Sequence, residues 1–324
     1  MNFTIIIPVK EINHYIRETV PFILNLLNKN WELIILPNED ELSEWQDSRI
    51  KIVSSGKCGP AKKRDLGARI ATGDILVFLD DDSYPQNDLL DVANNFFLNT
   101  EVVALGGPAI TPRHDSFWQK VSGAVFLSKF SGGIPERYLS LGNVKEIYDW
   151  PSVNFMVRKK DFLEIGGFNS PYWPGEDTKL CLDLIQKTSK KILYIPQMIV
   201  WHHRREGLLA HLKQIGAYGI HRGFFVKLYP QTSRKIIYFI PSFFFIFNSI
   251  SLFYFIFPII IKKLILLGWM VYATAILMAM LDILKYENIV TALSSLVYIF
   301  FTHLYYGYRF LQGLCTKKLI SKLR

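Results

Sequence analysis

Short apolar runs alternate with amphipathic segments through the first 200 residues, and this alternation predicts a layered α/β domain. The apolar runs are rich in Ile, Val and Leu and are bounded by polar residues or Gly, as is typical of buried strands. The segments between them have apolar residues at helical spacing. The predicted strands cover residues 4–9, 33–36, 52–54, 75–79, 102–106, 153–157 and 192–195. The predicted helices cover residues 17–27, 61–71, 89–97 and 177–187.

Three longer apolar blocks follow this region. Residues 236–261 contain 26 residues without a charge, residues 264–281 contain 18, and residues 289–307 contain 19 with one titratable side chain. About 20 apolar residues cross the core of a bilayer as a helix. We therefore predict a soluble domain over residues 1–230 and a membrane region over residues 231–324.

The charge divides in the same place. Residues 1–235 have a net charge of +3, whereas residues 236–324 have a net charge of +6. This distribution favours contact with anionic lipid headgroups, or ordinary topology-setting flanks, over nucleic-acid binding. A strand-like run begins at Phe3 without a preceding basic region, so we expect no cleaved signal peptide. The three widely spaced cysteines suit reduced thiols, and we expect the soluble domain on the cytoplasmic side of an inner membrane.

The membrane region allows two arrangements. If all three blocks span, Lys262-Lys263 and the basic C-terminal tail both face away from the cytoplasm, against the positive-inside tendency. If residues 236–261 are interfacial or re-entrant, residues 264–284 and 289–310 form a transmembrane hairpin with both basic clusters inside. We favour this second arrangement. Residues 205–228, which mix apolar and basic side chains, predict either an interfacial helix or a terminal helix packed on the soluble domain.

Three consecutive carboxylates, Asp80, Asp81 and Asp82, follow the predicted strand at residues 75–79. Open α/β sheets bind ligands at the carboxyl ends of their strands. Alternate residues of an extended segment point to the same side, so Asp80 and Asp82 are expected to face a cleft while Asp81 turns away. A bridging Mg²⁺ or Mn²⁺ relieves their repulsion and typically holds a diphosphate. A solvated turn is the alternative for an isolated Asp run.

Two other polar clusters carry candidate chemistry. In "VWHHRR", His202 or His203 is a candidate to complete the coordination of the metal. Arg204 and Arg205 are candidates to neutralise a diphosphate, and a basic patch at the membrane surface is an equally supported alternative. A Glu-Asp pair at residues 176–177 begins a predicted helix, where the residues by themselves favour N-terminal capping.

Four linked motifs resemble the family 2 glycosyltransferases of the GT-A fold. They are Ile5-Ile6-Ile7-Pro8, "GPAKKRDLGARIATGDILVFLDDD" at residues 59–82, "NFMVRKKDFLEIGGF" at residues 154–168 and "GEDTKLCL" at residues 175–182. The resemblance implies a Rossmann-like mixed sheet with helices on both faces, followed here by membrane helices. It also implies sugar transfer from a nucleotide-diphosphate donor, with inversion at the anomeric carbon.

The resemblance also implies roles for individual residues. Asp82 binds the metal on the donor diphosphate, Asp80 lies nearer the ribose or base, and Asp177 is the general base with Glu176 in reserve. The donor-binding candidates are Pro8, Asn38, Glu39, Lys63, Arg64, Asp80, Asp81, Arg204 and Arg205. The metal-binding candidates are Asp82, Asp80, His202 and His203. The acceptor-binding candidates are Asn154, Trp173, Gln214 and Arg222, although the Gln-x-x-Arg-Trp spacing of processive relatives is absent, which puts processivity in doubt.

The function that follows is a membrane-attached, metal-dependent inverting glycosyltransferase of cell-surface glycan or polysaccharide assembly. Its expected partners are a nucleotide-diphosphate sugar, a lipid-linked acceptor and the membrane. A glycan on a lipid carrier is preferred as acceptor because Asp177 offers a base, whereas polyprenyl phosphate, the alternative, is already ionised. A non-catalytic scaffold on a degenerate transferase fold is the alternative of another class. A transporter is disfavoured because few ionisable residues lie in the apolar blocks.

Overall fold

The computed structural model describes residues 1–321, which form two compact units that interleave along the chain. The first unit contains residues 1–112, 139–203 and 320–321, and the second contains residues 113–138 and 204–319. The predicted boundary at residue 230 separates a soluble region from a membrane region. It does not coincide with a boundary between the two compact units and stays a prediction.

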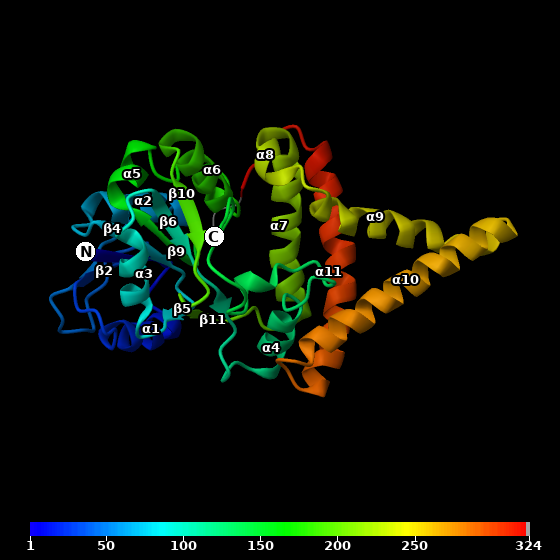
Figure 1. The fold of residues 1–324 in the computed structure, drawn as a ribbon, viewed down its shortest axis with the longest axis horizontal. Helices are drawn as coiled ribbons and strands as arrows, with labels where there is room; N and C mark the ends of the chain where they lie inside the picture. The colour runs from blue at the N-terminus through cyan, green and yellow to red at the C-terminus, as the bar shows by residue number, and fades with distance from the viewer. Residues whose placement is uncertain (322–324) are drawn as a thin grey trace. The chain divides into compact units, whose positions relative to one another are not determined.

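The first unit is built on an eight-stranded sheet in the order β3-β2-β1-β4-β9-β6-β10-β8 (Figure 1). Its strands are β1 (Phe3–Pro8), β2 (Trp31–Leu36), β3 (Ile50–Ile52), β4 (Ile75–Leu79), β6 (Val102–Gly106), β8 (Lys145–Glu146), β9 (Asn154–Arg158) and β10 (Lys191–Tyr194). Strands β3, β2, β1 and β4 are parallel, whereas β9 is antiparallel to both of its neighbours. The predicted mixed α/β sheet is confirmed.

Helices cover both faces of this sheet because its strands alternate their apolar side chains. Ile5 and Ile7 of β1 belong to one core, and Ile6 belongs to the other. The first core is closed by α1 (His14–Leu24) and α3 (Leu89–Phe97). The second is closed by α2 (Pro60–Ile70), α5 (Lys159–Glu164) and α6 (Glu176–Thr188). The predicted placement of helices on both faces is therefore confirmed.

In the first unit the largest difference from the predicted bounds is at α1, which begins three residues earlier than expected. Asn13 caps this helix, because its side chain accepts a hydrogen bond from the backbone N–H of Ile16. The helix then continues through Pro21 and ends at Leu24. The amphipathic pattern identified the helix, but its start depends on this cap.

A second, three-stranded sheet in the order β5-β11-β7 was not predicted. It contains β5 (Ser83–Pro85), β7 (Ala109–Ile110) and β11 (Val200–His202), which are too short to give a periodic signal. Strand β11 pairs antiparallel with β5, and His202 lies opposite Ser83. This pairing returns a distant segment of the chain to the end of the Asp80–Asp82 turn.

The second unit is helical, and its helices are α4 (Phe117–Ala124), η1 (Pro135–Arg137), α7 (Leu208–Leu228), α8 (Pro230–Ser233), α9 (Ile236–Ser251), η2 (Tyr254–Ile256), α10 (Ile259–Ile283) and α11 (Ile289–Cys315). By length and composition, α10 and α11 are each long and apolar enough to cross a membrane. The apolar helix α9 is shorter, at 16 residues.

Candidate functional site

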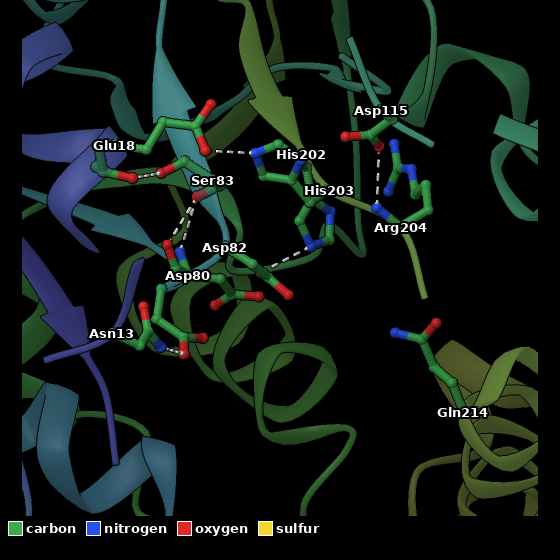
Figure 2. Close-up of polar contacts among 12 residues, drawn as sticks. Asn13, Glu18, Asp80, Asp82, Ser83, Asp115, His202, His203, Arg204 and Gln214 are labelled. Carbon is green, nitrogen blue, oxygen red and sulfur yellow. Dashed lines mark hydrogen bonds and ion pairs between the residues drawn. The ribbon is translucent and has the colours of Figure 1, made fainter. Parts of the chain in front are cut away.

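The turn after β4 is held in one conformation by Ser83. The Ser83 hydroxyl accepts a hydrogen bond from the Asp80 backbone N–H at 3.1 Å and donates one to the Asp80 carbonyl at 2.9 Å. Figure 2 shows Ser83 directed at Asp80, and helix α1 also holds the turn, because the Thr19 hydroxyl donates to the Ser83 carbonyl at 2.8 Å. The position of the carboxylates is therefore set by the turn and by α1.

Asp80, Asp82 and His202 form a candidate metal site. Their potential ligand atoms all lie within 4.8 Å of one another, and Asp82 Oδ1 is 3.1 Å from His202 Nε2. Asp82 is only 3% exposed. Two carboxylates and an imidazole form a mixed oxygen and nitrogen donor set, which fits Mn²⁺ and, less well, the oxygen-preferring Mg²⁺.

His203 does not belong to this group. Its Nε2 lies 3.0 Å from Glu18 Oε2 of α1, and its backbone N–H donates to the Asp82 carbonyl at 3.0 Å (Figure 2). Of the two histidines considered from the sequence, the structure brings His202 to the carboxylates and directs the His203 side chain to α1. The expectation that either histidine completes the site is thereby narrowed to His202.

Asp81, the middle carboxylate, contacts a different partner from its neighbours. Its Oδ2 accepts a hydrogen bond from Asn13 Nδ2 at 3.2 Å, while the other side-chain atom of Asn13 caps α1. Asp81 thus links the turn to the start of α1, whereas Asp80 and Asp82 belong to the candidate metal group.

Arg64 connects the Asp run to the Glu-Asp pair. It projects from α2, is 2% exposed, and donates from Nη2 to Asp80 Oδ1 and from Nη1 to Glu176 Oε1, the latter at 3.1 Å. Its Nε–H is buried without a hydrogen-bond partner within residues 1–321. The sequence suggested that Arg64 gives positive charge to the donor, and in the structure two of its nitrogens are held by protein carboxylates.

The Glu-Asp pair opens α6 directly after Gly175, whose φ of 110° is in the region that favours glycine. Glu176 is 4% exposed, and burial raises its pKa to about 8; the charge of Asp177 adds to this shift and Arg64 opposes it. Asp177 is less buried, and its Oδ1 accepts a hydrogen bond from the Thr178 backbone N–H at 2.8 Å. Asp177 is therefore the more accessible carboxylate of the pair.

The other donor-binding candidates lie near the ends of β1 and β2. Lys63 is buried, which lowers its pKa, and its ammonium donates to the carbonyls of Val9 and Leu36 and to Asn38 Oδ1 at 2.8 Å. These contacts tie the two strand ends together and fix Asn38. Pro8 is the buried last residue of β1, whereas Glu39 is exposed with its carboxylate 3.7 Å from the Lys57 ammonium.

Among the acceptor-binding candidates, Asn154 and Trp173 lie in the first unit. The Asn154 amide donates to the carbonyls of Pro108 at 2.9 Å and Met198 at 2.7 Å. Asn154 thereby fixes the segments that lead into β7 and β11. Trp173 is half-buried, and its backbone N–H donates to the Ser321 hydroxyl at 3.0 Å.

The remaining candidates lie in the second unit. The Arg204 guanidinium is 4.9 Å from the Tyr138 ring centroid, and its backbone N–H donates to Asp115. Arg205 is half-buried beside it in the chain. The other two are on α7, where Gln214 donates to the Tyr218 hydroxyl and Arg222 donates to the Ser233 hydroxyl.

Sequence reasoning missed the contributions of α1. Asn13, Thr19 and Glu18 hold Asp81, Ser83 and His203, respectively. The Glu18–His203 contact joins residues 185 positions apart, so no local pattern indicates it. The available signal was Asn13 in the N-cap position before the helix, since Thr19 is buried within the apolar face.

Comparison with known proteins places this site in a family. The family described as Glycosyl transferase family 2 matches residues 4–166. A glycosyltransferase of Haemophilus influenzae is 32% identical over 203 residues, which cover 60% of this chain and 76% of that protein. The glucosyl-dolichyl phosphate glucuronosyltransferase of Haloferax volcanii is 24% identical over 203 residues, which cover 57% of this chain and 63% of that protein.

Among solved structures, GalNAc-T7 with UDP, GalNAc and Mn²⁺ aligns with a TM-score of 0.48 at 14% identity, covering 72% of this chain and 51% of that one. The family match includes β1, the Asp80–Asp82 turn and β9. It spans half of the chain and includes the first two motifs on which the resemblance rests and all but the last two residues of the third. The chain belongs to glycosyl transferase family 2.

Proposed function

We propose that this protein is a membrane-attached, metal-dependent glycosyltransferase. It moves a sugar from a nucleotide-diphosphate donor to a lipid-linked acceptor at the cytoplasmic face of an inner membrane, in the assembly of a cell-surface glycan. The observation that carries the proposal is the convergence of Asp80, Asp82 and His202 at the end of β4, with Arg64 joining this group to the Glu-Asp pair of α6.

Asp82, Asp80 and His202 are the residues that would hold Mn²⁺ or Mg²⁺. A bound divalent cation supplies positive charge opposite the donor diphosphate and so stabilises the departing nucleoside diphosphate. Within the site, Asp80 also meets the Arg64 guanidinium, which fixes the orientation of its carboxylate. The Lys63 ammonium donates a hydrogen bond to Asn38 Oδ1 and so holds the donor-binding segment in place.

Asp177 acts as the general base. The bond between the anomeric carbon and the diphosphate oxygen breaks, a bond forms from the acceptor hydroxyl oxygen to that carbon, and Asp177 takes the hydroxyl proton. Attack on the face opposite the leaving group inverts the anomeric centre. Glu176 is buried against Arg64 and positions the start of α6, so Asp177 is preferred for the proton transfer.

The lipid-linked acceptor is supported by two observations. The Haloferax relative is named for a dolichyl phosphate-linked substrate, and the chain has two helices long enough to cross a membrane. A hydroxyl acceptor on a lipid-carried glycan requires a base, and Asp177 supplies one. The chain covers 63% of the Haloferax protein, and the choice of donor sugar is left to experiment.

The test is release of nucleoside diphosphate by the detergent-solubilised full chain against a panel of nucleotide sugars, with Mn²⁺, Mg²⁺ or a chelator. We expect metal-dependent release, with Asp82→Asn and Asp177→Asn each slower by at least 100-fold. Glu101→Gln, which alters an exposed carboxylate outside the site, is the control and should retain full activity.

Activity that survives chelation, or full activity in both Asp variants, would contradict the mechanism. No release with any donor, from protein that binds neither metal nor nucleotide, would instead support the non-catalytic scaffold.

A further inference from the structure

Helix α7 covers α11 along much of its length. His211 Nε2 lies 2.8 Å from the Thr302 hydroxyl, and the Lys227 ammonium donates to the Leu314 carbonyl at 2.6 Å. The two helices are so close that a Cβ on Gly223 would lie 2.1 Å from the Phe310 carbonyl oxygen. They run side by side in the same direction (Figure 1), so α7 must lie wherever α11 lies.

Residues 113–138 hold the first half of α11 and the end of α10. The Ser131 carbonyl accepts a hydrogen bond from His303 Nε2 at 3.0 Å, and the Trp118 ring stacks on Tyr298. The Ser128 hydroxyl donates to Asp282 Oδ2 at 2.9 Å. The connection between α10 and α11 is therefore on the same side of a membrane as residues 113–138.

Neither covering segment can cross a bilayer readily. Residues 113–138 follow β7, lead into β8 and carry six Asp, Glu, Lys or Arg residues. Helix α7 starts six residues after β11 and carries Lys213, Arg222 and Lys227. A charge at the bilayer centre is costly even on permissive scales. Both segments must stay on the side of the catalytic strands, and so must both ends of α11.

The two faces of α11 fit a position at the membrane surface. Its buried face is mixed, with the polar residues Thr291, Ser295, Thr302 and His303 beside Ile299 and Phe310. Its exposed face is apolar and includes Val290, Leu293, Val297 and Phe301. A helix whose polar groups are covered by protein and whose open face is apolar suits the interface between headgroups and acyl chains.

Helices α9 and α10 form a hairpin whose base lies at α11. Near the base, the Ser242 hydroxyl donates to the Gly307 carbonyl, and Asp282 binds Ser128. The Phe244 ring stacks on Tyr272 at 4.1 Å where both contact His303 of α11, and further out the helices touch each other through the Phe247 and Trp269 rings, 5.5 Å apart. They meet at residues 252–258, away from α11 (Figure 1). These residues are called the distal turn. At about 1.5 Å per residue, α10 is long enough for a bilayer core of about 30 Å, and α9 with the following turn nearly so.

The charges agree with this hairpin. Residues 236–261 contain no charge, and Lys262-Lys263 follows directly beside the distal turn. Arg234, Lys235, Lys285, Lys317 and Lys318 are all at or beyond the base. The greater positive charge is therefore on the cytoplasmic side, as the positive-inside tendency requires.

We propose that α9 and α10 form the hairpin that crosses the bilayer. Helix α11 lies at the membrane surface, on the same side of the membrane as the catalytic strands, and is covered by α7 and residues 113–138. The occupant of the exposed α9–α10 surface is the lipid bilayer. This inference rests on the membrane attachment in the proposed function, and it replaces the transmembrane pair of residues 264–284 and 289–310 expected from hydropathy.

Cysteine accessibility tests this arrangement in the full chain. In a Cys58→Ser, Cys315→Ser background, Phe255→Cys marks the distal turn and Tyr286→Cys marks the α10–α11 connection. A membrane-impermeant maleimide is applied to intact expressing bacteria and to permeabilised ones. We expect Phe255→Cys to be labelled in intact cells at least tenfold more than Tyr286→Cys, which reacts after permeabilisation. Lys263→Cys is the second distal probe.

Labelling of Tyr286→Cys in intact cells would overturn the proposal in favour of an α10–α11 transmembrane pair. Protection of both Phe255→Cys and Lys263→Cys in intact cells would also overturn it, by showing that the distal turn does not reach the far side. The readout needs no catalysis, so its failure is distinguishable from failure of the proposed reaction.

Discussion

At the scale of single residues, the site depends on one buried guanidinium. Arg64 pairs with Asp80 through Nη2 and with Glu176 through Nη1. One carboxylate of the candidate metal site and the first residue of α6 therefore share a partner. A buried ion pair adds little net stability over an apolar replacement, but removing one member leaves a buried charge unpaired. Arg64 is thus a positioning residue whose loss affects both carboxylates.

Replacing Arg64 should therefore destabilise the protein. We expect Arg64→Met to lower the free energy of unfolding by about 3 kcal/mol, since Asp80 then loses its charged partner and the buried Glu176 carboxyl loses a hydrogen-bond donor that water cannot replace. The double variant Arg64→Met/Glu176→Gln should recover part of that loss. The measurement is thermal unfolding in detergent.

Arg69→Met is the matched control for Arg64→Met, because Arg69 lies on the same helix with an exposed side chain. It should change the free energy of unfolding by less than about 0.5 kcal/mol. Additive losses in the double variant would show that Arg64 and Glu176 do not interact.

At the scale of elements, buried polar contacts join the helices of the second unit. His211 of α7 is fully buried, with Nδ1 2.7 Å from the Ser122 hydroxyl of α4 and Nε2 2.8 Å from the Thr302 hydroxyl of α11. One imidazole therefore connects three helices. Burial lowers its pKa from 6.5 to about 4.

This contact should make stability depend on pH. The unfolded chain protonates His211 near pH 6.5 and the folded chain near pH 4, so the free energy of unfolding should fall as the pH decreases between those values. Above pH 6.5 the contribution is constant. From pH 7.5 to pH 5 the contribution of His211 should fall by about 2 kcal/mol. Because Glu176 titrates with the opposite sign in this range, this contribution is taken as the difference between the profiles of the unaltered chain and of His211→Gln. The measurement is thermal unfolding in detergent at both pH values.

His211→Gln should remove this part of the pH dependence, whereas His14→Gln, on the exposed surface of α1, should leave it unchanged. An unaltered pH profile in His211→Gln would show that His211 is not the group responsible.

At the scale of the whole molecule, apolar composition does not by itself distinguish a spanning helix from a surface helix. Both α10 and α11 pass the test of length and hydropathy, yet α11 has α7 and residues 113–138 against it and α10 is largely uncovered. The difference is in the contacts of each helix, and it determines how the chain enters the bilayer.

Two valines provide a matched comparison of these helices. Val271 is 63% exposed on α10, and Val297 is 53% exposed on α11. Val271→Glu places a charge near the middle of the proposed hairpin, at a cost of about 2.5–3.5 kcal/mol, whereas Val297→Glu can reach the headgroups. We expect Val271→Glu to reduce the carbonate-resistant membrane fraction at least threefold, and Val297→Glu to reduce it much less. Equal losses would indicate that α11 also crosses the bilayer.

The sequence by itself determined the α/β class, the strands and helices of the main sheet except β8 and α5, the apolar helices and the place of the Asp run at the end of β4. These features are local, because periodicity, turn residues and hydrophobic length are properties of neighbouring positions. The family resemblance added candidate roles for residues, such as Asp177, that local pattern alone assigned to helix capping.

Only the tertiary structure decided which of two adjacent histidines meets Asp82, which carboxylates Arg64 holds and which apolar helix is covered. Each depends on residues far apart in the chain, 112 positions for Arg64 and Glu176 and 154 for Ser128 and Asp282. A three-residue strand such as β11 has no periodic signal, and its register with β5 decides which way His202 and His203 point. The physical reason is that long-range pairing, unlike local propensity, is chosen by the packing of the whole fold.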